Sequence, residues 1–348
     1  MTYQPRSSWL VIEATSDEHT VIFDGTRPRP YASLARRKTG ATLSTVELND
    51  LVSEIIDAGD AAPVVRQLGD VGVVASPIMG PPSDHAVYGV CLWIGDDASA
   101  LPEQPRTIGT MLWDPETLET LHCPITDGVI LGYDPPQERR VSTEVFKRFQ
   151  HYPNEHLLGP WAAGIMEGTT PRDDTFDDEL DIIRTDESLR HVYLTMRVVD
   201  VDGRNVIRGI IHDISDLYPP RGHRGFDRQT ARASFKMVAD VDGDHGYGHV
   251  NFATGIILEW FVAPPGPLAV WETQNVKWDN EDCYLQYLQK AKDGEQVEFS
   301  TVVSFDAGER FPVRVTIHPS NSGEDGNGVI IVSPATPPPG DDGAILAF

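Results

Sequence analysis

The sequence predicts an α+β protein with three domains and mainly antiparallel sheets. A chain of 348 residues is long enough for two or three domains with buried cores. Strands, a helix and further strands follow one another over about the first 95 residues, which predicts an α+β domain with a mainly antiparallel sheet. One order of elements occurs twice in the second half of the chain. We expect domains at residues 1–98, 107–217 and 231–334, followed by a flexible tail at 335–348.

The N-terminal domain is predicted from two strand pairs and one helix. Trp9–Ala14 and Thr20–Asp24 are β-branched runs around a polar turn, which predicts a hairpin. Val71–Pro77 and Val87–Ile94 predict two further strands around a turn rich in Gly and Pro. Between the pairs, residues 44–58 predict a helix. Ser44 and Glu47 form a capping box at its start. Its apolar residues fall on one face: Leu48, Leu51, Val52, Ile55 and Ile56.

The second domain is predicted from strands at its two ends. Thr107–Trp113 and Glu119–Cys123 flank a turn at Asp114-Pro115. Helical and loop-like sequence follows as far as Pro171, and the acidic stretch 172–181 predicts a solvated loop or a helix start. The domain closes with two alternating strands joined by a hairpin turn: Arg190–Asp200 and Val206–Ser215.

An internal repeat links the second and third domains. Residues 126–136, TDGVILGYDPP, resemble residues 254–265, TGIILEWFVAPP, and strands close both blocks. Two copies of one domain are the economical interpretation. The alternative is that two unrelated α+β domains share short apolar strings by chance.

The charge of the chain limits its partners. There are 28 Lys and Arg residues against 53 Asp and Glu residues, giving a formal net charge of −25. Nucleic acid and anionic lipid are therefore repelled in bulk. The basic runs Arg36-Arg37-Lys38 and Arg221 to Arg232 are short. We expect a small molecule or another protein as partner, and no nucleic acid.

Cysteine content and the N-terminus favour the cytoplasm. Cys91, Cys123 and Cys283 are widely spaced and predict small core residues, without a CxxC pair for a metal. The N-terminus lacks the apolar core of a signal peptide, and no segment has the length of a membrane span. The sequence thus predicts a cytoplasmic protein with no membrane span.

Residues 203–216, GRNVIRGIIHDISD, resemble the end of a PAS domain, in which a Gly and an apolar run precede Asp-Ile-Ser. The third domain keeps the strands but ends in GVIIVSP, so whether it is a true PAS domain stays open. Residues 71–96 resemble a GAF domain in Pro77, Gly89 and the run Val90–Ile94. Together these regions resemble actinobacterial proteins with one GAF and two tandem PAS domains and no obvious output domain.

A ligand cavity is the main site that the PAS resemblance implies. In such a domain the inner helices and the sheet enclose a small space. We expect five residues to line it: Phe146, Phe149, Trp161, Ile165 and Met166. The alternative is that these residues are ordinary core packing.

Other chemical motifs are weak. Nucleotide-binding glycine loops and the GxSxG nucleophile motif do not occur. Asp240, Asp242 and Asp244 lack the Gly and Glu of a calcium loop and predict an acidic hairpin turn, with His245 and His249 nearby. His122-Cys123 reverses the order of a bilin attachment pair. No motif marks any of the candidate haem ligands, which are His151, His156 and His191. We therefore expect no cofactor and no metal.

The function expected from these features is a non-catalytic sensor or regulatory protein. It would bind a small ligand or a protein partner that supplies the output. A scaffold with filled cores, or an enzyme of unrecognised type, are the alternatives. Prolines interrupt both expected linkers, which argues against a coiled-coil relay. We therefore expect a compact monomer or weak dimer whose domains couple through their faces.

Overall fold

The computed structural model confirms an α+β protein with three mainly antiparallel sheets. It describes residues 8–34, 45–59, 62–68, 71–95, 106–221, 228–241, 243–305, 308–320 and 326–335. Most of the expected linkers, the tail after Ala335, Ser44 and the run Arg36-Arg37-Lys38 lie outside these ranges. The chain forms two compact units. The first spans residues 1–114, 120–139 and 171–222, and the second spans 115–119, 140–170 and 223–348.

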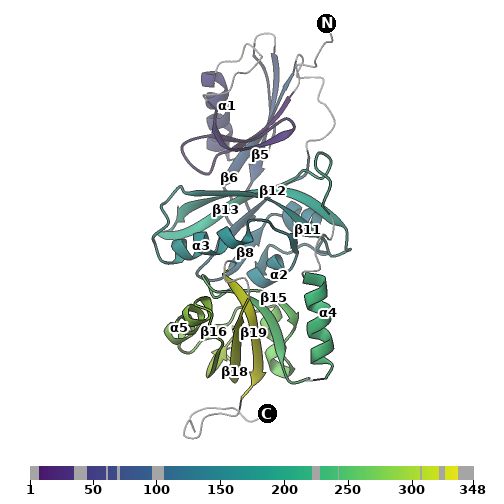
Figure 1. Cartoon of the computed structure of the whole chain (residues 1–348). Coiled ribbons are helices and arrows are strands. Elements are labelled where there is room, and N and C mark those ends of the chain that lie inside the picture. Colours follow the sequence, from purple (N-terminus) through teal and green to yellow (C-terminus); the bar gives the residue numbers. More distant parts are fainter. Residues whose placement is uncertain are drawn as a thin grey trace. The chain divides into compact units, whose positions relative to one another are not determined.

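The N-terminal sheet has the strand order β3-β2-β1-β6-β5-β4. Its strands are β1 (Ser8–Glu13), β2 (Thr20–Asp24), β3 (Arg27–Ser33), β4 (Val64–Leu68), β5 (Val71–Met79) and β6 (Val87–Gly95). Helix α1 (Thr45–Ala58) packs its apolar stripe against β5 and β6 (Figure 1). The predicted hairpin, helix and later strand pair are confirmed. Strands β3 and β4 were not predicted.

Strand β1 of the N-terminal sheet is buried on both of its faces. Leu10 and Ile12 of β1 lie in a core with the α1 stripe. Val11, between them, belongs to a second cluster that contains Tyr193 and Ile210. Because successive side chains of a strand point to opposite faces, β1 contacts α1 with one face and the second domain with the other.

The second sheet has the order β11-β12-β13-β7-β8 in the first unit. These strands are β7 (Ile108–Asp114), β8 (Glu119–His122), β11 (Thr175–Ile183), β12 (Leu189–Val201) and β13 (Arg204–Asp213). The hairpin of β12 and β13 is confirmed, with Val201 opposite Arg204. The acidic stretch 172–181 was predicted as a loop or helix start, and this was wrong. It forms most of β11, whose Asp181 is 1% exposed.

Short helices occupy the stretch between β8 and β11, as predicted. They are the π-helix η2 (Ile125–Ile130), α2 (Ser142–Phe146) and α3 (Glu155–Met166), with the short strands β9 (Arg139–Val141) and β10 (Phe149–His151) between them. Helices α2 and α3 belong to the second unit.

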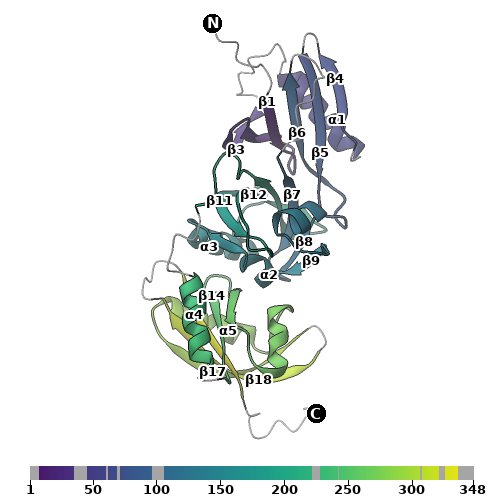
Figure 2. The ribbon, with the colours of Figure 1, turned by 90° about the vertical axis from the view of Figure 1, so that its right-hand side faces the viewer.

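The third sheet has the order β15-β14-β19-β18-β17-β16. Its strands are β14 (Gly246–Asn251), β15 (Ile257–Val262), β16 (Lys277–Trp278), β17 (Val297–Ser304), β18 (Arg310–Pro319) and β19 (Asn327–Pro334). Helix α4 (Arg228–Ala239) contacts β15, and α5 (Glu281–Lys292) contacts β16, β17 and β18 (Figure 2). The short helix η3 (Gly266–Glu272) adds Leu268 and Trp271 to the core.

The second and third sheets share one topology. The order β8-β7-β13-β12-β11 corresponds to β15-β14-β19-β18-β17, which agrees with the predicted repeat. The two similar strings are not equivalent, however. Residues 126–136 start in η2, whereas residues 254–265 contain β15. Short apolar strings do not distinguish a helix from a strand, so the string comparison gave the wrong register.

The acidic segment before Asn251 also differs from the prediction. It was expected to be a hairpin turn between two strands. Instead, Asp240 and Asp244 lie between α4 and β14, and His249 lies within β14. Asp242 lies outside the described residues.

Candidate ligand and coupling sites

The structure buries three of the five predicted pocket residues. Phe146, Phe149 and Ile165 are at most 9% exposed, and the two phenyl rings meet edge to face with centroids 5.4 Å apart. Trp161 is half-buried, and Met166 is 37% exposed at the end of α3. The end of α2 and the start of β10 therefore bring the two phenylalanines together, and Met166 reaches the surface. The ligand-lining role of the five residues stays a prediction.

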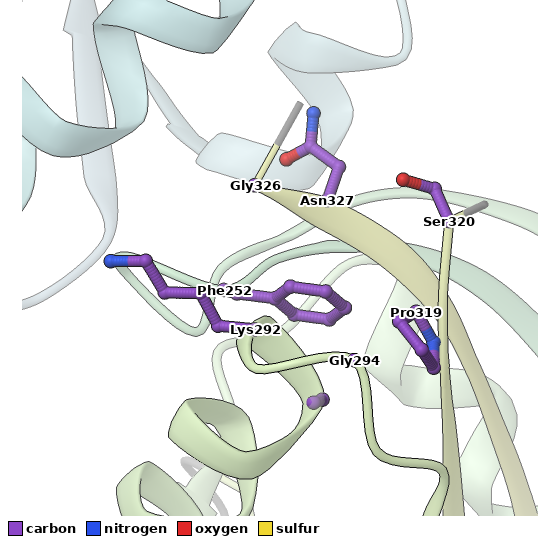
Figure 3. Close-up of a pocket in the computed structure, with 8 residues that line it drawn as sticks. Phe252, Lys292, Gly294, Pro319, Ser320, Gly326 and Asn327 are labelled. Atoms are coloured by element: carbon purple, nitrogen blue, oxygen red, sulfur yellow. The ribbon is translucent and has the colours of Figure 1, made fainter. Parts of the chain in front are cut away.

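A pocket of about 260 Å³ lies at one end of the third sheet (Figure 3). It is bounded where β18 ends, where β19 begins and where α5 ends. Phe252, from the apolar core, contributes an aromatic wall, and Lys292 is the one charged residue among the described residues that line the pocket. Asn327 accepts a hydrogen bond from the Asn251 amide at 2.8 Å. The lining residues are Phe252, Ala291, Lys292, Gly294, Pro319, Ser320, Gly326 and Asn327.

A buried ion pair joins the N-terminal sheet to the second sheet. Arg197 of β12 donates from Nε to Glu13 Oε1 at 3.0 Å and from Nη2 to Glu13 Oε2 at 2.7 Å. The Arg197 side chain is 8% exposed and the Glu13 side chain 3%. Glu13 also accepts from the Thr20 hydroxyl, and Arg197 Nη1 donates to the carbonyl oxygen of Asp173. The two buried charges are thus paired and further hydrogen-bonded, as burial requires.

Further contacts extend this junction along both sheets. Arg208 of β13 donates to Asp84 at 2.9 Å, and the Tyr31 hydroxyl donates to the carbonyl oxygen of Met196 at 2.5 Å. Between these polar contacts lies an apolar cluster that includes Phe23, Tyr88, Cys91, Tyr193 and Ile210. This mixture of apolar packing and paired charges fixes the register of one sheet on the other. The direct packing of these two domains was expected, and coupling through their faces stays a prediction.

His191 is a buried imidazole held by carboxylates. Its Nδ1 lies 2.6 Å from Asp181 Oδ1 and its Nε2 lies 3.3 Å from Glu179 Oε2. Both acids belong to β11, where sequence reasoning expected a solvated stretch. Of the other haem candidates, His156 is exposed, and the side chain of His151 lies outside the description. The geometry gives His191 a structural hydrogen-bonding role between β11 and β12.

The cysteines follow the prediction in two of three positions. Cys91 and Cys123 are buried, and Cys283 is half-exposed in the first turn of α5, where a core position was expected. Burial raises the pKa of the Cys91 thiol to about 12. Cys123 Sγ accepts a hydrogen bond from the Thr110 amide at 3.2 Å, and its neighbour His122 lies 3.3 Å from Asp127. His122 and Cys123 are thus parts of a packed polar interior.

The described residues show neither a metal-ligand cluster nor a membrane-spanning helix. In those parts of the chain, no three His, Cys, Asp or Glu side chains are grouped so that they could hold a metal ion. None of the described helices is long and apolar enough to cross a membrane.

Comparisons with known families give two matches. Residues 8–103 match a family model described as Rv3651-like, N-terminal. Residues 130–216 match a PAS domain model, in agreement with the predicted resemblance of 203–216. The GAF resemblance of residues 1–98 stays a prediction. A search of curated proteins gave no match.

Among solved structures, an uncharacterised protein from Mycobacterium tuberculosis is similar over nearly its whole length. The TM-score is 0.66 at 15% identity, covering 95% of this chain and 97% of that one. A sensory box histidine kinase/response regulator from Burkholderia thailandensis gives a TM-score of 0.24 at 18% identity, covering 39% and 92%. The PAS domain of an HTR-like protein from Haloarcula marismortui gives 0.23 at 14%, covering 31% and 81%. The chain therefore contains a PAS region after an Rv3651-like N-terminal region, and it shares the fold of the mycobacterial protein.

Proposed function

We propose that the chain is a non-catalytic sensor or regulatory protein that binds a small ligand or a protein partner. The observation that carries this proposal is the PAS match of residues 130–216. PAS domains serve in many proteins as sensory modules. The fold alone does not determine an activity, so the proposal also needs a physical route by which a signal would travel.

The buried Glu13–Arg197 pair supports such a route. Arg197 lies on β12, inside the matched PAS region, and Glu13 lies on β1 of the N-terminal sheet. A shift of β12 would either move β1 with it or break a buried ion pair. Breaking such a pair costs about 3–5 kcal/mol. A change within the PAS region would therefore be passed to the N-terminal sheet as a movement of one rigid body.

The finer parts of the proposal concern the other domains. The third domain would be a second PAS-like module, because its strand order repeats that of the matched PAS sheet. The N-terminal domain would be GAF-like, with six antiparallel strands and α1 on one face. Output would come from a separate protein partner, and the chain would act in the cytoplasm as a monomer or weak dimer.

An interaction scaffold without a ligand is the second candidate function. One observation favours it. Phe146, Phe149 and Ile165, which were expected to line a ligand cavity, are buried, and the two phenyl rings pack against each other. In this view the matched PAS region would serve only as a stable surface for a protein partner.

Native mass spectrometry of freshly purified protein would separate the two candidates. A sensor that binds a small molecule should retain part of it, giving a mass above that of the polypeptide and a change in hydrogen exchange when it is removed. The scaffold should give the polypeptide mass, and hydrogen exchange should not change after extensive dialysis. A retained molecule whose removal leaves exchange unchanged in β1, β12 and β13 would contradict the sensory proposal.

A further inference from the structure

A cleft of about 200 Å³ lies between the N-terminal sheet and the second sheet, within the first unit. Trp9, Val11, Phe23 and Ile108 supply aromatic and aliphatic surface to its walls, and Arg106, His212 and Asp216 contribute polar surface of about the same extent. The volume corresponds to roughly seven water molecules at about 30 Å³ each. It therefore suits a compact molecule with a single ring.

His212 is the lining residue whose polar atoms lack hydrogen-bond partners among the described residues. It lies on β13, opposite Ile108 of β7, and is 3% exposed. Neither ring nitrogen has a hydrogen-bond partner among the described residues. The ring contacts Phe23 edge-on, with centroids 4.4 Å apart. A buried polar group without a partner costs free energy, so a residue of this kind in a cleft indicates a binding partner.

The protonation state of His212 defines what it offers. Burial, together with the neighbouring Arg106 guanidinium, lowers the pKa of His212 to about 3. The imidazole is therefore neutral near pH 7. A neutral imidazole has one N–H donor and one nitrogen acceptor. A complementary ligand would present an acceptor, a donor or both to this edge.

The charges in the cleft lining already neutralise each other. Arg106 donates from Nε to Asp216 Oδ1 at 2.6 Å and from Nη1 to the carbonyl oxygen of Gly25 at 3.1 Å. An ionised ligand would lie beside aromatic and aliphatic side chains, and both charged groups of the lining are already paired with each other, which is unfavourable. The charge balance therefore favours an uncharged ligand.

We propose that this cleft binds an uncharged one-ring aromatic molecule whose polar edge pairs with His212. The inference rests on the proposed sensory function, because it names the place and the chemical class of the sensed ligand. Its position also fits that role. The cleft is lined by β1, β2 and β6 on one side and by β7 and β13 on the other. A bound ring would contact both sheets.

Benzamide is the probe that tests the proposal, with benzoate and benzamidine as negatively and positively charged compounds of nearly the same shape. Each is titrated into the full chain, and the ¹⁵N signals of the histidine side chains are followed by NMR. Benzamide should shift the His212 nitrogens and should bind at least about tenfold more tightly than either charged compound. Equal effects of the three compounds, or no shift of His212 because the cleft holds only water, would overturn the proposal.

Two variants sharpen the test. His212→Phe keeps a ring but removes both nitrogens, so it should lose benzamide binding, whereas His156→Phe, at an exposed position, should keep it. Trp9→Ala removes a half-buried indole ring from the wall of the cleft and keeps His212. This variant should bind benzamide more weakly. Unchanged binding in both cleft variants would place the site elsewhere.

The outcomes separate this site from the sensory role. If benzamide shifts signals of residues 146–166 and leaves His212 unchanged, the cleft proposal is wrong and the sensory proposal stands. If benzamide binds at His212 but hydrogen exchange of β1 and β12 does not change, the site is confirmed and the sensory proposal is contradicted.

Discussion

Arg197 and Glu13 form a two-pronged, buried ion pair although they lie 184 residues apart in the chain. The pair connects β12 with β1, between two sheets that also meet through an apolar cluster and through the contacts Arg208–Asp84 and Tyr31–Met196. The pair is one of the buried contacts that hold β12 against β1.

Arg197→Met should destabilise the first unit by about 3–5 kcal/mol, because it leaves the Glu13 carboxylate buried without its counterion. The Arg197→Met/Glu13→Leu double variant should recover most of this loss, since neither charge stays buried. Urea unfolding measures both. The control is Arg172→Met, which breaks an exposed pair with Asp200 and should cost less than about 1 kcal/mol. A loss for Arg197→Met no larger than that of the control would contradict the account.

The neutral His212 should make stability depend on pH. Its pKa is lowered, first by burial, from 6.5 to about 3. Between these pH values His212 binds a proton in the unfolded state and not in the folded state. The free energy of unfolding therefore falls as the pH falls through this window. From pH 7 to pH 5 the wild type should lose roughly 2 kcal/mol relative to His212→Phe.

Urea unfolding at the two pH values measures this difference, and His156→Phe serves as the control because that side chain is exposed. The control should follow the wild type at both pH values. If His212→Phe loses as much stability as the wild type on acidification, the imidazole is not buried in its neutral form.

The three cysteines should differ in reactivity. The thiolate is the reactive form, and burial raises the pKa of Cys91 to about 12, while Cys283 is half-exposed on α5. Iodoacetamide at about pH 8 should label Cys283 in the native protein and all three cysteines after unfolding. Peptide mass spectrometry gives the labelled fraction at each site. Labelling of Cys91 as fast as Cys283 would show that the packed junction opens readily.

Elements with a clear local period could be predicted from the sequence. The α1 stripe of Leu48, Leu51, Val52 and Ile55 follows the helical period, and all four residues are buried against the N-terminal sheet. The β12–β13 hairpin has alternating residues and a DVDGRN turn. In both cases the information that fixes the element lies within a few neighbouring residues.

Strand β11 could not be predicted in the same way, because its acids are satisfied by the neighbouring strand. The Tyr193 hydroxyl donates to Asp177, and His191 pairs with Asp181. These partners become visible only when β12 lies beside β11. Strand β3 carries two prolines, which weaken a strand prediction, yet it pairs with β2 at the sheet edge where proline is tolerated.

The Glu13–Arg197 pair between the two sheets could not be predicted from the sequence either. Nothing in the strings around Glu13 and Arg197 marks them as partners, since the pairing depends on which face of each sheet is turned toward the other. His212 was part of the string that resembles a PAS ending, but only the fold shows it buried beside Phe23 and Arg106. Sites formed between sheets need tertiary structure, whereas the PAS region could be predicted from a local string.

A signal in the PAS strands reaches the N-terminal sheet if the two sheets respond as one body. Peptide-resolved hydrogen–deuterium exchange of the wild type and of Arg197→Met tests this. We expect protection to fall by the same free energy in β1 and β6 as in β12 and β13, because these strands open together. Loss of protection in β12 and β13 with unchanged exchange in β1 and β6 would contradict it, since a signal in the PAS strands would then not reach the N-terminal sheet.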